Sequence, residues 1–224
     1  MYIQTLLIDA VALIIGIVIH ESAHALAAYL LGDKTARSRG RVSLNPLAHI
    51  DPFGTVLLPL LMLAAGGPVF AFAKPVPVYL NNLKHPKRDE LLVALAGPLS
   101  NVLLALIGAL IGHLLMPALV LQLPMDFLYC LFSFFMTFIV VNLSLAFFNL
   151  IPLPPLDGSS ILVPFLKGKA LQEYYRIQQY AMPILLVILY LLPSVLRIDI
   201  IGMYFDVTVY PLAQGLTSFM VSAI

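Results

Sequence analysis

The sequence predicts an all-α polytopic membrane protein with about five to six transmembrane helices. Of its 224 residues, 61% are hydrophobic and 10% are charged, whereas soluble domains have about 25% charged residues. Long apolar runs alternate with short segments that hold most of the lysines and arginines, as in membrane spans joined by loops. The composition therefore excludes an ordinary soluble domain. The formal net charge of +1 gives no indication of a nucleic-acid partner, and none is expected.

The first apolar run, residues 3–31, predicts a retained span that ends at Gly32. It contains an H-E-x-x-H sequence at residues 20–24. His20 and His24 are four residues apart, so on a helix their imidazoles lie on one face and can converge on one metal ion. Glu21 lies about 100° further round the helix, which suits a general base better than a ligand. This pattern is typical of zinc peptidases. The alternative is a histidine pair packed inside a helix bundle, with Glu21 reaching an interface.

Residues 34–51 are basic and polar, and they predict a short extended β-hairpin at the membrane surface. Arg37, Arg39 and Arg41 lie in this segment. Because lysine and arginine are enriched in cytoplasmic loops, the segment is expected on the cytoplasmic side. His49 could join a metal site, but a surface histidine with an ordinary hydrogen bond is the preferred interpretation.

Residues 53–73 are apolar, but the run is divided by Pro59 and by Gly66, Gly67 and Pro68. The uninterrupted helical part is therefore short for a span, which needs about 20 residues. Basic residues flank it on both sides, so we predict a re-entrant segment near the active site that enters and leaves on the cytoplasmic side. A bare strand edge there could pair with an unwound substrate. The alternative is a sixth full span.

Two further helices are predicted at residues 89–115 and 127–150. The first begins with Asp89 and Glu90, where acidic residues favour a helix start, and it contains G-P-L-S-N at residues 97–101. Small residues in that motif allow close helix packing, and its polar residues can bond across an interface. Another span is predicted at residues 177–196 with a kink at Pro183. An apolar segment, residues 207–224, either spans the membrane or lies partly in the interface.

The proline-rich loop after residue 150 ends in Asp157-Gly158. A zinc ion with two imidazole ligands needs a third protein ligand in a catalytic site. A carboxylate at membrane depth is costly unless it is paired or bound to a metal. Asp157 is therefore a candidate third ligand; the alternative is an ordinary Asp-Gly turn.

These motifs together resemble the site-2 protease family of intramembrane metalloproteases. The resemblance covers about residues 3–158, and the basic segment and the Gly-Gly-Pro sequence are similar to compact prokaryotic members. It implies a three-helix catalytic core, one zinc ion per chain held by His20, His24 and Asp157, and a water activated by Glu21. It also implies that Asn149 holds the substrate backbone or polarises the scissile carbonyl; the alternative for Asn149 is a helix-end hydrogen bond. Unlike larger members, the chain has no inserted PDZ-like domain and no nucleotide-sensing domain.

The resemblance implies a zinc-dependent endopeptidase that cleaves transmembrane segments of membrane proteins. We expect one integral-membrane domain over residues 1–224, with a catalytic core at 1–158 and accessory helices at 159–224. We expect a multi-pass protein of a prokaryotic inner membrane, with its active site toward the cytoplasm. The expected partners are the lipid bilayer and a transmembrane protein substrate. The oligomeric state stays open. The alternatives are a membrane metal transporter, which would not need Glu21, and an inactive scaffold, which should lose a ligand or Glu21.

Overall fold

The computed structural model describes residues 2–57 and 73–223, and in these two ranges the chain is helical and contains no β-strand. Three helices are long and apolar enough to cross a membrane: α1 (Tyr2–Leu30), α4 (Pro86–Leu119) and α5 (Met125–Asn149). A bent pair farther along the chain raises the number to four if it forms one span. The all-helical membrane fold agrees with the sequence. The predicted count of five to six spans is not confirmed by the described residues.

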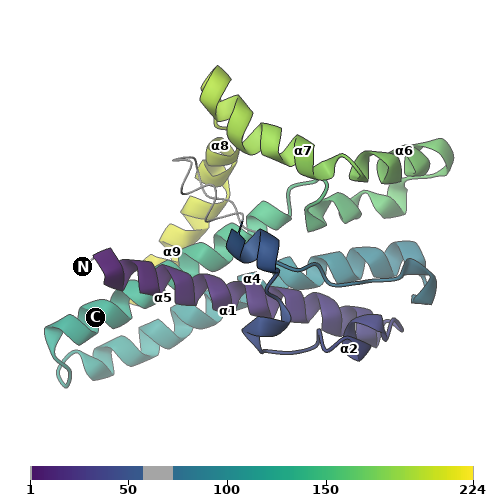
Figure 1. The fold of residues 1–224 in the computed structure, drawn as a ribbon. Coiled ribbons are helices and arrows are strands. Elements are labelled where there is room, and N and C mark those ends of the chain that lie inside the picture. The colour runs from purple at the N-terminus through teal and green to yellow at the C-terminus, as the bar shows by residue number, and fades with distance from the viewer. Residues whose placement is uncertain (1, 58–72, 224) are drawn as a thin grey trace.

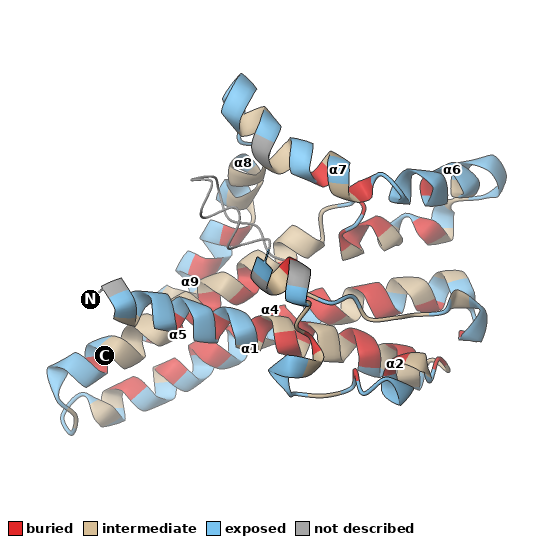
Figure 2. Cartoon of the chain, viewed as in Figure 1, coloured by how far each residue is buried: buried red, intermediate tan, exposed pale blue. Residues whose placement is uncertain are grey.

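The three long helices pack against one another and form the centre of the molecule (Figure 1). Their buried residues lie mainly where the helices face each other, and their outer sides are largely exposed (Figure 2). On α4 the exposed side is a stripe of leucines: Leu99, Leu103, Leu106 and Leu110. Exposed leucines on such a helix are suited to lipid, since lipid tails are as apolar as leucine.

Each long helix begins and ends close to the positions that the sequence predicts. Gly32, just after α1, has a φ of +118°, which a residue with a Cβ rarely adopts. Asp33 follows it and is buried. Helix α4 continues through Pro98 and Pro117. Prolines are tolerated within membrane helices because neighbouring groups satisfy the freed carbonyls.

The part of the chain after residue 160 consists of shorter helices. They are α6 (Gly168–Gln178), α7 (Ala181–Leu186), a π-helix (Val187–Leu196), α8 (Ile200–Val207) and α9 (Val209–Val221). Helix α6 meets the segment at 181–196 at an angle of 70°. This bend precedes α7, so the kink predicted at Pro183 is misplaced: Pro183 occupies the first turn of α7, where a missing N–H costs little.

The terminal apolar segment closes the bundle. Helix α9 packs on α4 and α5, and its residues complete a buried cluster of Ala105, Ala109, Phe135, Ile139, Leu143, Val209, Ala213 and Met220. With 13 residues, α9 is shorter than the roughly 20 residues of a full span. Residues 207–224 are expected either to span the membrane or to lie partly in the interface. The structure shows a short helix there that covers the core.

The β-hairpin predicted for residues 34–51 is not found. This segment forms α2 (Thr35–Ser38) and a 3₁₀ turn (Pro46–Ala48). The buried Arg41 guanidinium donates hydrogen bonds to the carbonyl oxygens of Ala48, Lys74 and Pro75. Because a side chain satisfies these backbone groups, the segment is held without a cross-strand ladder. The predicted re-entrant segment falls mostly on residues 58–72, outside the described residues; at 52–57 the chain forms a π-helical turn.

Candidate metal centre

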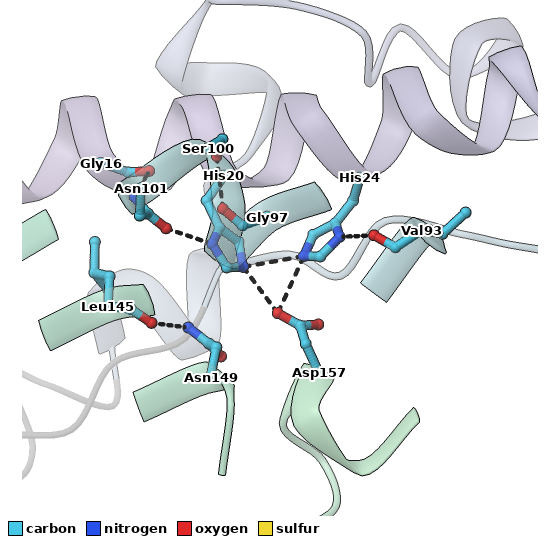
Figure 3. A network of polar contacts seen from close by, with 10 residues as sticks. All are labelled: Gly16, His20, His24, Val93, Gly97, Ser100, Asn101, Leu145, Asn149 and Asp157. Atoms are coloured by element: carbon cyan, nitrogen blue, oxygen red, sulfur yellow. Dashed lines mark hydrogen bonds and ion pairs between the residues drawn. The ribbon is translucent and has the colours of Figure 1, made fainter. Parts of the chain in front are cut away.

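Two imidazoles and a carboxylate meet between α1 and the loop that follows α5 (Figure 3). His20 Nε2 and His24 Nε2 are 3.0 Å apart. Asp157 Oδ2 lies 3.1 Å from His20 Nε2 and 3.2 Å from His24 Nε2. The structure thus brings together three residues that the sequence separates by up to 137 positions.

The two histidines come from one face of α1, as their spacing predicts, and both are buried. Asp157 reaches them because the chain turns sharply after α5 and starts a 3₁₀ turn (Asp157–Ile161). Gly158 is required in this turn: a Cβ there would overlap the Leu150 carbonyl group. The buried Ser159 accepts a hydrogen bond from the Tyr174 hydroxyl at 3.1 Å, which ties the turn to α6.

The partners of the other ring nitrogens fix which nitrogen carries the proton. His20 Nδ1 lies 2.6 Å from the Asn101 side-chain oxygen, and His24 Nδ1 lies 2.7 Å from the Val93 carbonyl oxygen. Both partners can only accept, so each neutral imidazole carries its proton on Nδ1 and has a lone pair on Nε2. Two nitrogen lone pairs and a carboxylate oxygen therefore point at one another with no proton between them, which is favourable only around a cation.

These donors fit zinc. Tetrahedral zinc with bonds of about 2.0–2.1 Å has ligand atoms about 3.3 Å apart. The three separations here, 3.0, 3.1 and 3.2 Å, are close to that value. Two histidines, one carboxylate and an adjacent cavity match a catalytic zinc site with an open position. From the sequence, Asp157 could be either a metal ligand or part of an ordinary Asp-Gly turn. The geometry places its carboxylate beside the two histidines.

A chain of asparagine hydrogen bonds orients His20 from behind. Asn101 Nδ2 donates to the Gly16 carbonyl oxygen at 3.1 Å and to the Asn142 side-chain oxygen at 2.9 Å. Asn142 in turn donates to the Phe138 carbonyl oxygen at 2.9 Å. Because each amide nitrogen faces an acceptor, the orientation of both amides is determined. These hydrogen bonds connect α5 to α4 and α4 to α1, and both asparagines are fully buried.

Sequence reasoning did not identify Asn142. Asn101 belongs to the G-P-L-S-N motif, for which bonding across a helix interface was expected, but its contact with His20 could not be specified. Asn142 lies within the apolar run of α5. A polar amide within an apolar run indicates that its side chain has a hydrogen-bond partner in the protein. The sequence does not indicate which residue that partner is.

Gly97 lets α4 approach the Nε2 atoms of His20 and His24 closely. A Cβ at this position would lie 2.6 Å from His20 Nε2 and would also overlap the His24 ring. The close approach predicted for the small residues of this motif is thus found at Gly97. Ser100 donates to the Gly97 carbonyl oxygen at 2.6 Å within the same helix.

A cavity of about 500 Å³ opens beside the three residues. Glu21 and Asn149 line it together with His20, His24 and Asp157. Asn149 Nδ2 donates to the Leu145 carbonyl oxygen at 2.9 Å, the helix-end bond considered as its alternative role. Among residues 2–57 and 73–223, its side-chain oxygen has no hydrogen-bond partner, and Asn149 lines the cavity. All five candidate site residues therefore border one space, although Glu21 and Asn149 do not bond to the other three.

The segment at 41–49 packs directly on the H-E-x-x-H turn. Ser22 Oγ donates to the Ser43 carbonyl oxygen at 2.5 Å. His49 Nε2 lies 2.7 Å from the same carbonyl oxygen and 3.3 Å from Ser22 Oγ. The expectation of a surface histidine is therefore wrong, because His49 is only 2% exposed. It is not one of the three residues of the metal group.

Comparison with known proteins agrees with this geometry. The family model described as "Peptidase family M50" matches residues 8–128 and 125–192. "Putative zinc metalloprotease YwhC" of Bacillus subtilis is 40% identical over 178 residues, which cover 80% of this chain and 78% of that protein. Rip2 of Mycolicibacterium smegmatis, which carries the same description, is 28% identical over 225 residues, 99% of this chain and 80% of that protein. No solved structure gives a significant match.

Proposed function

The chain belongs to peptidase family M50, the site-2 type of zinc metalloendopeptidase, and from this premise we propose that it hydrolyses peptide bonds within transmembrane segments of other membrane proteins. The observation that carries the proposal is the convergence of two imidazole lone pairs and one carboxylate beside a Glu-lined cavity, among helices suited to a bilayer. A peptidase site that lies among membrane-spanning helices acts on chains that are themselves in the membrane.

His20, His24 and Asp157 would hold one zinc ion per chain. The chemistry that bound zinc supplies is polarisation of a carbonyl group and a lowered pKa of an attacking water. Asn101 and the Val93 carbonyl keep the two imidazoles in the tautomer that presents Nε2 lone pairs. Such outer hydrogen bonds fix ring orientation and raise ligand basicity.

Glu21 is the proposed general base. Its position next to His20 on α1 brings its carboxylate to the cavity without joining the metal group. Within the described residues the Glu21 carboxylate has no hydrogen-bond partner, so its oxygens are available to accept the proton of the attacking water. Glu21 then returns a proton to the leaving amine.

Asn149 is the proposed contact with the substrate backbone. A transmembrane segment must unwind locally before cleavage, because a helix uses its carbonyl oxygens in internal hydrogen bonds. An unwound backbone needs replacement partners in an apolar environment. Asn149 lines the cavity together with Pro75, Val76 and Val78, which belong to a segment without regular secondary structure. We propose that Asn149 and this segment hold the extended substrate.

The active site is proposed to face the cytoplasm. Hydrogen bonds connect the basic segments in pairs: Arg41 to Lys74 and Pro75, and Lys87 to the Leu166 carbonyl. His24 is six residues from the end of α1, about 9 Å along its axis. Basic loops are enriched on the cytoplasmic side, so the basic segment after α1 places this end of the helix in the cytoplasm. Water would then reach the site from the cytoplasm over this short distance. An inner membrane of a prokaryotic cell is the proposed location.

Cleavage of single-span membrane peptides by purified, zinc-loaded protein tests the proposal. The Glu21→Gln variant, which keeps the three metal-binding residues, is measured in the same detergent with its zinc content. We expect cleavage by the wild type, none by the variant, and one zinc per chain in both. Equal cleavage by both proteins would remove Glu21 as the base. Zinc bound without cleavage of any peptide in the panel would contradict the peptidase assignment and favour a transport or scaffold role.

A further inference from the structure

Glu90 is a third carboxylate on the wall of the cavity, beside Glu21 and Asp157, and the catalytic scheme does not use it. It lies on α4 three residues before Val93, whose carbonyl holds His24. Glu90 Oε2 accepts a hydrogen bond from the Tyr175 hydroxyl at 3.1 Å, and the Ser160 hydroxyl is a second partner. The carboxylate is therefore held between α6 and the turn that carries Asp157.

No helix-start role explains this carboxylate. Asp89 already occupies that role, because its Oδ2 accepts the His85 N–H at 2.8 Å. The nearby cations are engaged elsewhere: Lys87 donates to the Leu166 carbonyl oxygen at 2.6 Å, and Arg88 pairs with Asp89 at 3.2 Å. In the part of the chain that the structure describes, Glu90 has hydroxyl partners but no ion-pair partner.

The charges of the cavity do not balance without a cation from outside the chain. Its lining includes three carboxylates, Glu21, Asp157 and Glu90. A bound zinc ion offsets two of these negative charges, and Glu90 is the carboxylate with no proposed role at the metal or as the base. The remaining lining is largely apolar, and a carboxylate in such surroundings is costly unless it is paired.

Resting on the proposed function, we propose that Glu90 is a specificity subsite that binds a lysine or arginine side chain of the substrate. One cavity is lined both by Glu90 and by His20, His24 and Asp157, and Val93, three residues after Glu90 on α4, contacts His24 through its carbonyl oxygen. Because an extended peptide advances about 3.3 Å per residue, the basic residue is placed within a few residues of the cleaved bond.

The chemistry of membrane substrates suits this subsite. A single-span segment carries lysine or arginine at its cytoplasmic end, and Glu90 lies near the start of α4, close to the basic segments of this chain. The hydroxyls of Tyr175 and Ser160 hold the carboxylate in place before a substrate binds. An arriving ammonium or guanidinium group would then form a charge-assisted hydrogen bond in a partly desolvated site.

The test compares peptides that differ at one position. A peptide cleaved by the wild type is mapped by mass spectrometry, and a single Lys or Gln is placed in turn at the three positions on either side of the bond. We expect one Lys position to raise kcat/KM about tenfold over Gln for the wild type, and Glu90→Gln to reduce this ratio to about one. Glu90→Lys should instead prefer the peptide with Glu at that position.

Glu173→Gln is the matched control, because Glu173 is an exposed α6 carboxylate paired with Arg176, and it should keep the Lys preference. Binding of the same peptides to the Glu21→Gln protein gives a second reading without turnover. Equal rates and equal binding of Lys and Gln peptides at all positions would overturn the subsite while leaving the peptidase intact. Absence of all cleavage would instead overturn the proposed function, and this inference with it.

Discussion

Asn101 supports the candidate metal centre without belonging to the group of His20, His24 and Asp157. Its side-chain oxygen accepts the His20 Nδ1 proton, and its amide nitrogen is fixed by Gly16 and Asn142. An acceptor at this position decides which ring nitrogen has the lone pair. Removal of such an outer contact commonly weakens metal affinity by about 10–100-fold.

We expect Asn101→Leu to weaken zinc binding by about 10–100-fold, because His20 would lose the partner that orients its ring. Competition with a chelator measures the affinity. Asn149→Ala serves as the comparison, since Asn149 does not touch either histidine: it should lower kcat and leave zinc affinity unchanged. An unaltered zinc Kd in Asn101→Leu would show that His20 is oriented by helix packing alone.

Gly97→Ala is expected to abolish zinc binding and activity while the protein still folds. The added methyl group would occupy the space of the two imidazoles, within 2.6 Å of His20 Nε2, so either α4 moves away or the rings rotate. Zinc content and circular dichroism are measured together. Gly215→Ala, at a position with nothing within 4 Å of the added carbon, should behave as wild type. Normal zinc content in Gly97→Ala would contradict the close approach of α4.

At the level of single residues, the sequence predicts what is local. His20, Glu21 and His24 follow from helical periodicity, and the structure shows them on one helix as predicted. The position of Asp157 beside the histidines depends on a turn after α5 and on the contact of that turn with Tyr174 of α6. Neither feature can be predicted from a local sequence pattern. The burial of His49 is not predicted for a related reason: it depends on contacts with Ser22 and Ser43, whereas the polarity of the segment favours a surface position.

Among the connecting elements, Asp33 joins the end of α1 to the segment before α4. Its carboxylate accepts hydrogen bonds from the Thr35 hydroxyl at 2.6 Å, the Tyr79 N–H at 2.7 Å and the Asn82 amide at 2.9 Å. Burial alone would raise the pKa of Asp33, but these donors outweigh it and lower the pKa to about 2 from an ordinary value of 3.8. The ionised form is therefore favoured in the folded protein.

This pKa gives a pH dependence with a definite sign. A carboxylate with a lowered folded pKa contributes stability that is fully present above its unfolded pKa and is lost as pH falls through the folded value. We expect the thermal stability of the wild type in detergent to drop between about pH 4 and pH 2. Asp33→Asn should be less stable at pH 7 and lose less stability over this range, so the two curves should approach each other toward pH 2. Parallel curves would contradict the assignment.

Arg41 holds the wall of the cavity from behind. Its guanidinium bonds to the carbonyls of Ala48, Lys74 and Pro75, and Pro75 lines the cavity. We expect Arg41→Met to cost on the order of 3 kcal/mol of stability, because buried carbonyls would lose a charged donor. Thermal unfolding measures this loss, and proteolysis near residue 75 should become faster. Arg39→Met, at an exposed position, should change neither quantity.

Across the whole molecule, the proposed orientation places the connection between α4 and α5 outside the cell. We expect Leu121→Cys, at a residue that is 92% exposed, to react with a membrane-impermeant maleimide in intact cells. Ser38→Cys should react only after the membrane is opened. Both are made in a Cys130→Ser background, since Cys130 is the single native cysteine. The reverse labelling pattern would invert the topology and place the active site near the outer face.

The long helices could be predicted from the sequence because a bilayer imposes their length and composition. Their boundaries differ from the predicted ones by a few residues, as at α1 and α5. The arrangement of residues 168–221 could not be predicted, because apolarity alone does not distinguish a span from a short helix that packs on others. Helix α9 is the example: Val209, Ala213 and Met220 are apolar because they cover α4 and α5.

The separation of His20 and Asp157 by 137 residues has a consequence for biosynthesis. The ribosome completes α1 first, and the two histidines are in the membrane before α4, α5 and the Asp157 turn have been made. Until then the site lacks its carboxylate and the asparagines that orient His20. If the proposed function holds, an unfinished chain therefore cannot cleave its own later helices or a neighbouring chain during membrane insertion. The order of synthesis alone thus delays assembly of the site until the last of its parts has been made.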